Sequence, residues 1–143
     1  MINAEQIISE LNALPDKHDA LKGLFNTFQR NLQGIESADF PLRNITVTTL
    51  SDTRSIVKFL DREYALVFST IITGSAITGT ISVYRALGRE RGSNAFKELT
   101  SRTFNIESIV SIQPPKNHDA IRLSEEDECV TLVLNWIYEE INK

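Results

Sequence analysis

The sequence contains few of the residues from which functional sites are most often built. Among 143 residues there is one cysteine, Cys129, and two histidines, His18 and His118. A single cysteine cannot form a disulfide within the chain, which is typical of a reducing compartment, so we expect a cytoplasmic protein. Each histidine stands beside an aspartate, but neither belongs to a metal-ligand or catalytic-triad motif. We therefore expect no metal, no cofactor and no enzymatic activity.

Long apolar segments are missing as well. The longest apolar stretches, around residues 64–72 and 129–138, fall far short of the ~20 residues that a membrane-spanning helix needs. No basic region precedes an apolar stretch at the start of the sequence, so we expect no secretory signal and no membrane partner. The hydrophobic fraction of 41% and the charged fraction of 24% are ordinary for globular proteins, which indicates a single domain over residues 1–143.

The net charge of −4 is unevenly distributed along the chain. Counted by segment, residues 1–42 carry −3, residues 43–122 carry +4 and residues 123–143 carry −5. Either the acidic ends are helices that dock on a basic sheet, or the basic segment binds an anionic partner. A nucleic-acid partner is not expected, because the pI is about 5.2 and no candidate recognition helix is basic.

The first part of the sequence predicts two helices. Asn3 followed by Gln6 resembles a capping box, and an apolar pattern of helical spacing then continues to Pro15, so we expect a helix over residues 4–14. A second helix is expected from about residue 16. Its apolar stripe at steps of three and four consists of Leu21, Leu24, Phe25, Phe28, Leu32 and Ile35.

Residues 45–83 change to the alternating pattern of strands. A turn at Gly74-Ser75 would pair Ile72 with Ile77 and Phe68 with Ile81, which gathers the large side chains on one face. A turn of three residues from Ser51 would pair Val47 with Val57. The intervening turn must have an even number of residues, and we place it at 62–63 or 61–64, which sets Val57 opposite Phe68. The threonines and serines of these strands are expected on a solvated face.

Residues 85–102 contain a cluster of arginines that could bind an anion. Arg85, Arg89, Arg91 and Arg102 surround a glycine-bracketed loop and would suit an anion, although no phosphate-loop motif is present. A solvated loop is the simpler interpretation. Residues 95–106 fit either a strand or a short helix, and the pattern does not decide between them.

The last part of the sequence predicts a third helix with an unusually wide apolar surface. Its apolar residues from Cys129 to Ile141 cover an arc of about 240°, against ~100° for an ordinary surface helix. Two arrangements account for this arc. The helix is packed on two sides within the subunit, or it forms a homodimer contact through Leu132, Trp136 and Tyr138, since aromatic residues favour interface cores.

Together these patterns predict an α+β fold. An antiparallel β-meander of about five to six strands would be packed by two N-terminal helices and one C-terminal helix. The small size, acidic pI and helix-flanked meander are reminiscent of secretion chaperones and toxin-immunity proteins, a likeness of class that assigns no residue a role. We expect a non-enzymatic, chaperone-, immunity- or adaptor-like module that binds another protein or itself. The alternative is an anion- or small-ligand-binding domain that uses the arginines of residues 85–102.

Overall fold

The computed structural model describes residues 3–36, 40–73, 76–86, 96–105, 109–110, 121–123 and 125–142. The helices are α1 (Ala4–Asn12), α2 (Leu14–Leu32), the short 3-10 helix η1 (Gln33–Glu36) and α3 (Glu126–Ile141). The strands are β1 (Ile45–Ser51), β2 (Arg54–Phe59), β3 (Arg62–Thr73), β4 (Ala76–Ala86), β5 (Phe96–Phe104), β6 (Ile109–Val110) and β7 (Ile121–Arg122). The sheet order β1-β2-β3-β4-β5-β6-β7, antiparallel throughout, is that of a meander. The predicted α+β class is confirmed.

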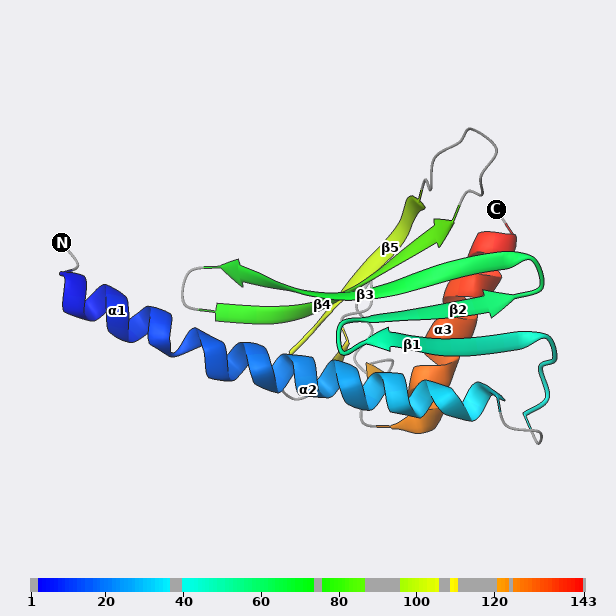
Figure 1. The fold of residues 1–143 in the computed structure, drawn as a ribbon, viewed down its shortest axis with the longest axis horizontal. Coiled ribbons are helices and arrows are strands. Elements are labelled where there is room, and N and C mark those ends of the chain that lie inside the picture. The colour runs from blue at the N-terminus through cyan, green and yellow to red at the C-terminus, as the bar shows by residue number, and fades with distance from the viewer. Residues whose placement is uncertain are drawn as a thin grey trace.

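The helices cover one face of the sheet. Figure 1 shows α1 and α2 as one long, bent helix that crosses the sheet, with α3 against the same face near the β1 side. Side chains from α2, α3 and strands β1 to β5 form one core between these layers, with Phe25, Phe28, Leu66, Ile81 and Trp136 among its members. Of the residues 95–106 that the sequence left open between strand and helix, Phe96–Phe104 form β5.

The bent helix begins and bends where the sequence indicates. Asn3 precedes α1, and its Oδ1 accepts a hydrogen bond of 2.8 Å from the main-chain N–H of Gln6, as the capping-box pattern predicts. The bend lies at Ala13, just before Pro15 in the first turn of α2. Proline is tolerated there because the first N–H groups of a helix have no partner within the helix.

The predicted strand register is confirmed in two hairpins and wrong in the third. Ile72 lies opposite Ile77, and Val47 lies opposite Val57, as expected. Between β2 and β3, however, the turn is Leu60-Asp61, so Val57 lies opposite Tyr64 instead of Phe68. Both turns are even in length and leave the same side chains on the core face, so the apolar pattern could not distinguish them.

Only the three-dimensional surroundings select the turn at Leu60-Asp61. Leu60 takes a left-handed conformation with φ 58°, which is uncommon for leucine, and its N–H donates to the carbonyl of Asn44 at 3.1 Å. The turn at Leu60-Asp61 also places Arg62 and Tyr64 next to α3. Nothing in the local sequence predicts a leucine in this conformation.

The sheet face opposite the helices is partly buried, contrary to the expectation of a solvated face. Thr46, Thr48 and Ser69 are exposed, but Thr80 and Ser82 are only 5% and 9% exposed. The guanidinium of Arg54 on β2 lies 5.7 Å from the ring centre of Phe96 on β5, although β3 and β4 separate these strands in the sheet. The sheet is therefore curled, and side chains of distant strands meet on its inner side.

A buried glutamine joins α2 to the first hairpin. Gln29, 2% exposed, donates from Nε2 to Ser55 Oγ at 2.7 Å and to the carbonyl of Ser51 at 3.0 Å. A buried amide is stable only if it is hydrogen-bonded, and these two acceptors satisfy its N–H groups. The contact fixes the position of α2 along the sheet.

We expect Gln29→Leu to lower the free energy of unfolding by about 1–3 kcal/mol, because Ser55 Oγ loses its donor in the core. The double variant Gln29→Leu/Ser55→Ala should recover part of this loss, since both polar groups are then gone. Urea denaturation of the wild type, both single variants and the double variant gives the coupling energy. Strictly additive losses would show that the two side chains do not interact.

Candidate functional site

The predicted interface residues of α3 lie on different sides of that helix. Leu132 and Trp136 are each 5% exposed and belong to the core, whereas Tyr138 is 68% exposed. Much of the wide apolar arc is thus covered inside the subunit, by the sheet on one side and α2 on the other. Tyr138 is the member of the predicted set that a partner could contact, together with Ile141 one turn further along.

The C-terminal end of α3 is attached to the sheet by a buried carboxylate. Glu140, with a side chain 7% exposed, accepts hydrogen bonds from Arg62 at 2.6 Å and Tyr64 at 3.0 Å, both to Oε2. Its Oε1 forms an ion pair with Arg85. One carboxylate therefore holds two guanidinium groups and a phenol from β3 and β4.

The pKa shifts in this cluster follow from its geometry. Burial alone would raise the pKa of Glu140, but the hydrogen bond from Tyr64 and the charges of Arg85 and Arg62 outweigh it, so the pKa is lowered. Burial, and then the hydrogen bond to Glu140, raise the pKa of Tyr64. The cluster therefore holds a charged carboxylate at neutral pH and a protonated phenol, which is the state of a structural attachment and supplies no general acid or base near pH 7.

The arginines of the alternative anion site are not brought together as free cations in the described part of the chain. Arg85 is paired with Glu140. Arg102 donates within its own strand, to Thr100 Oγ1 at 2.8 Å and to the carbonyl of Ser101 at 3.1 Å. Arg89 and Arg91 lie outside the described residues, so the structure tests only half of this set.

Within the described residues, Cys129 and His18 have separate surroundings and are not brought together in one site. Cys129 is buried, its thiol donates to the carbonyl of Leu123 at 3.2 Å, and Asn31 Nδ2 lies 3.8 Å from its sulfur. Burial raises the pKa of the Cys129 thiol to about 11. The hydrogen bond from Asn31 lowers this pKa and the charges of the nearby glutamates raise it, so the thiol is protonated at neutral pH. His18 packs against Phe68, with ring centres 5.7 Å apart, and His118 lies outside the described residues.

A shallow depression beside the β2–β3 turn is lined by charged residues. Its volume is about 340 Å³, and its lining consists of Lys58, Leu60, Asp61, Arg62 and Glu63. Lys58 and Glu63 are themselves 3.7 Å apart. Opposite charges that face each other across an open surface are solvated and largely neutralise one another, so this depression does not select for a ligand of either sign.

The apolar stripe of the long helix continues beyond the sheet that it covers. From α1 into α2 the stripe repeats at alternating steps of four and three residues, a spacing that keeps one side of a helix facing a partner. Its members are Ile7, Leu11, Leu14, His18, Leu21, Phe25, Phe28 and Leu32. The last four are fully buried, but Ile7 is 45% and Leu11 58% exposed, and α1 has no buried residue at all.

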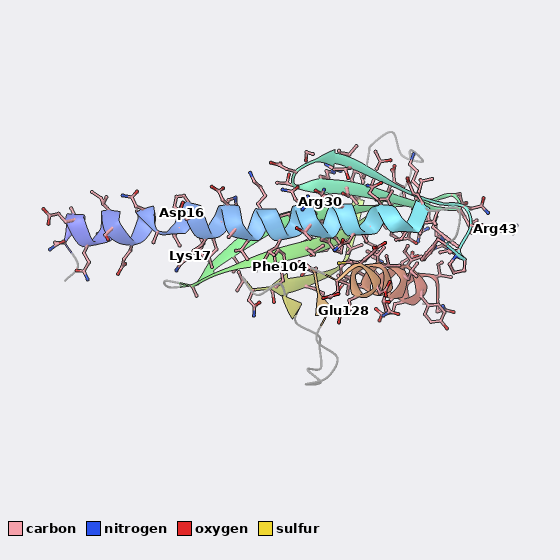
Figure 2. All side chains as sticks on the ribbon, turned by 90° about the horizontal axis from the view of Figure 1, so that it is seen from below. Asp16, Lys17, Arg30, Arg43, Phe104 and Glu128 are labelled. Atoms are coloured by element: carbon pink, nitrogen blue, oxygen red, sulfur yellow. The ribbon has the colours of Figure 1, made fainter. Side chains whose placement is uncertain are left out.

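The reason for this exposure is visible in the arrangement of the elements. In Figure 2, α1 extends past Asp16 and Lys17, which mark the point where the sheet ends beneath the helix. Ile8, on the flank of the same stripe, is 57% exposed. The stripe has the composition of a packed surface but no strand beneath it.

The last residues of β3, next to the β3–β4 turn, lie at the same end of the molecule (Figure 1). Ile71 and Ile72 are 47% and 55% exposed, on opposite faces of the ribbon. We call the surface formed by Ile7, Ile8, Leu11, Ile71 and Ile72 the apolar end. Exposed apolar groups clustered at one end of a small protein mark interaction surfaces more often than scattered ones do.

Sequence reasoning noted the helical spacing of the apolar residues of α1 and the pairing of Ile72 with Ile77, but it did not predict that these side chains of α1 and Ile72 are exposed. It also missed Glu140, for which a signal existed. Glu140 continues the buried line of Cys129, Val133 and Trp136 at steps of four, three and four. A carboxylate in such a line requires cationic partners on the facing sheet.

Comparison of the chain with protein-family models, with curated proteins and with solved structures gave no match. Within the residues that the structure describes, no helix is long and apolar enough to cross a membrane. The same residues contain no group of three or more potential metal ligands.

Proposed function

We propose that this chain is a non-enzymatic protein-interaction module, and that its binding surface is the apolar end. The observation that carries the proposal is the stripe of α1, which repeats the spacing of the buried stripe of α2 yet has no buried member. Apolar helix faces at this spacing bind other polypeptides in grooves or against sheets. Chaperone-, immunity- and adaptor-like roles are all compatible with such a surface, and a cytoplasmic location is proposed with it from the single cysteine.

Two further features support a binding role for this end. The α1 stripe is short, so its few exposed apolar side chains would supply most of the binding energy to a partner. The flank of α1 carries Glu5 and Glu10 and no basic residue, so all charges beside the stripe are negative and a partner must approach it through uncharged groups. The anion-binding alternative has no comparable support, since Arg85 is already paired with Glu140.

We expect a photo-crosslinking benzophenone amino acid at position 11, in place of Leu11, to form a covalent adduct with a polypeptide. The crosslinking is done by irradiating cells of the organism in which the chain naturally occurs. The same group at Thr131, an exposed polar position on α3, is the matched control and should give no such adduct. Peptide mass spectrometry identifies the partner. If position 11 gives no adduct with any polypeptide, including a second copy of the chain, the proposed function is wrong.

The identified partner, once purified, should bind the Leu11→Glu variant at least ten-fold more weakly than the wild type, because binding would then bury an unpaired charge. Glu10→Gln is the control, since it alters charge beside the stripe and leaves the apolar face intact. Leu11 is exposed, so the substitution should leave the melting temperature unchanged. Equal affinities of wild type and Leu11→Glu would contradict the assignment of the surface.

A further inference from the structure

One edge of the sheet is covered by the chain itself. The N–H of Val47 on β1 donates to Glu36 of η1. Gln33 Nε2 also lies 3.4 Å from Thr49 Oγ1. Residues of the segment that follows α2 thus occupy main-chain and side-chain groups along β1, which prevents another strand from pairing there.

Among the residues that the structure describes, none covers the edge of β3 near the hairpin tip in this way. The N–H of Phe68 donates to the carbonyl of Thr53 at 2.8 Å, which is the last link between β3 and the β2 side of the sheet. In an antiparallel ladder, alternate residues direct both main-chain groups to the same side. Thr70 and Ile72 therefore direct their N–H and C=O groups away from β4, and within the described part of the chain no strand lies beyond them.

This edge also lacks the residues that usually prevent strand addition. Between Ser69 and Tyr84 the sequence contains no charged residue and no proline. β3 and β4 pair without a bulge over the whole hairpin. Natural edge strands are normally protected by lysine, proline or a bulge, so an edge without any of these is suited to pairing.

We propose that a second copy of this chain pairs with this edge, antiparallel and across a two-fold axis at Ile71. The inference rests on the proposed function, because it names the partner of the apolar end. In this register Thr70 of each copy lies opposite Ile72 of the other, and each such pair exchanges two main-chain hydrogen bonds. A register centred on Thr70 would place Ile72 opposite Phe68, whose N–H is already bonded to Thr53.

The absence of charge on the hairpin permits a second copy to approach at this place. Each copy carries a net charge of −4, so two copies repel over most of their surfaces. The hairpin is the longest uncharged part of the described sheet, so two hairpins approach without opposing like charges. The pairing is also self-complementary, as a two-fold interface requires, and it brings the exposed Ile71 side chains of both copies together.

Disulfide trapping of the full-length chain tests the register directly. Ile71→Cys should form a covalent dimer under mild oxidation, because residues that face each other across a strand pair have Cα atoms within the range a disulfide spans. Ser69→Cys, on the same face of the same edge, is the control. In this register the two Ser69 positions lie about 13 Å apart, too far for a disulfide. The wild type, with only the buried Cys129, should stay monomeric on a denaturing gel.

Sedimentation equilibrium gives an independent measurement. The wild-type mass should rise from 16.1 kDa towards twice that value as concentration increases. Ile71→Lys, which sets two lysines opposite each other, should weaken the dimer at least ten-fold, whereas Thr131→Lys makes the same charge change on α3 and should not. Both sites are exposed, so folding is preserved.

The outcomes separate this inference from the proposed function. Equal trapping of Ile71→Cys and Ser69→Cys, or a wild type that stays monomeric at all concentrations, would overturn the two-fold pairing. If an adduct at position 11 then contains a different protein, the interaction module stands and only its partner changes. If position 11 captures nothing, the proposed function fails, and the trapping and sedimentation results alone decide the two-fold pairing.

Discussion

Replacing Glu140 by glutamine is expected to lower the free energy of unfolding by about 2–4 kcal/mol. Glutamine keeps the size of the side chain but removes the charge that Arg62 and Arg85 face, and its amide group adds a donor where acceptors are needed. The two arginine side chains are 31% and 35% exposed, so they can partly turn to water, which limits the loss. Chemical denaturation at neutral pH measures the effect.

Glu139 provides the matched control for this substitution. It is adjacent to Glu140 on α3, carries the same charge and is exposed. Glu139→Gln should change the unfolding free energy by less than about 0.5 kcal/mol, as exposed substitutions usually do. Similar losses in both variants would mean that the effect comes from the net charge of α3 and that the cluster with Arg62, Tyr64 and Arg85 contributes nothing specific.

The pH dependence of the Glu140 contribution has a definite sign. The pKa of Glu140 in the folded chain is below its ordinary value of 4.5. The native state therefore binds the proton less tightly than the unfolded chain, so the stabilisation is complete above about pH 4.5 and is lost as the pH falls through the native pKa. The difference between wild type and Glu140→Gln should be constant near neutral pH and shrink in acid. A difference that grows in acid would contradict this assignment.

Gly79→Ala is expected to lower the free energy of unfolding by about 3 kcal/mol. A Cβ at this position would overlap with Cζ of Phe104 and lie 2.6 Å from its Cε1, because the Phe104 ring covers the bare backbone of Gly79 from the neighbouring strand. Phe104 is 1% exposed and packs against Phe68, with ring centres 6.1 Å apart, so it has little room to move. Thermal or urea unfolding measures the loss.

Gly23→Ala tests whether this loss is specific to the site. Gly23 lies within α2, where an added Cβ would meet nothing within 4 Å. Alanine is the better helix former, so this variant should gain about 0.5–1 kcal/mol. The two substitutions are chemically identical, and their effects should have opposite signs. A small loss in Gly79→Ala would show that Phe104 does not rest on the glycine.

The fold was predictable largely because alternation and helical spacing report which side of an element is buried. The capping contact of Asn3, the pairing of Ile72 with Ile77 and the pairing of Val47 with Val57 all follow from residues close in sequence or from matched apolar faces. The same pattern could not distinguish a turn at residues 60–61 from one at 62–63, because both leave the same side chains on the core face of the sheet. Hence the β2–β3 turn was placed wrongly.

The candidate site was predicted less well because it depends on where elements end. Each apolar residue of α1 has the spacing of a core residue, and the sequence gives no sign that the sheet stops near His18. For Leu132 and Trp136 the error was the reverse, because they were predicted at an interface and are buried in the core. They are typical interface residues by type, but α2 and the sheet enclose them from two sides.

By itself, the sequence determined the class of fold, the order of elements and the face that each strand buries, since these depend on periodicity within segments of about ten residues. Only the tertiary structure decided that Glu140 is held by Arg62, Tyr64 and Arg85 and that Phe104 covers Gly79. It also decided that α1 has no buried residue and that, within the described residues, no strand pairs with β3 beyond Phe68. These features depend on the relative lengths and the curl of elements far apart in the chain. No local pattern encodes such lengths, because each element satisfies its own spacing wherever its neighbours end.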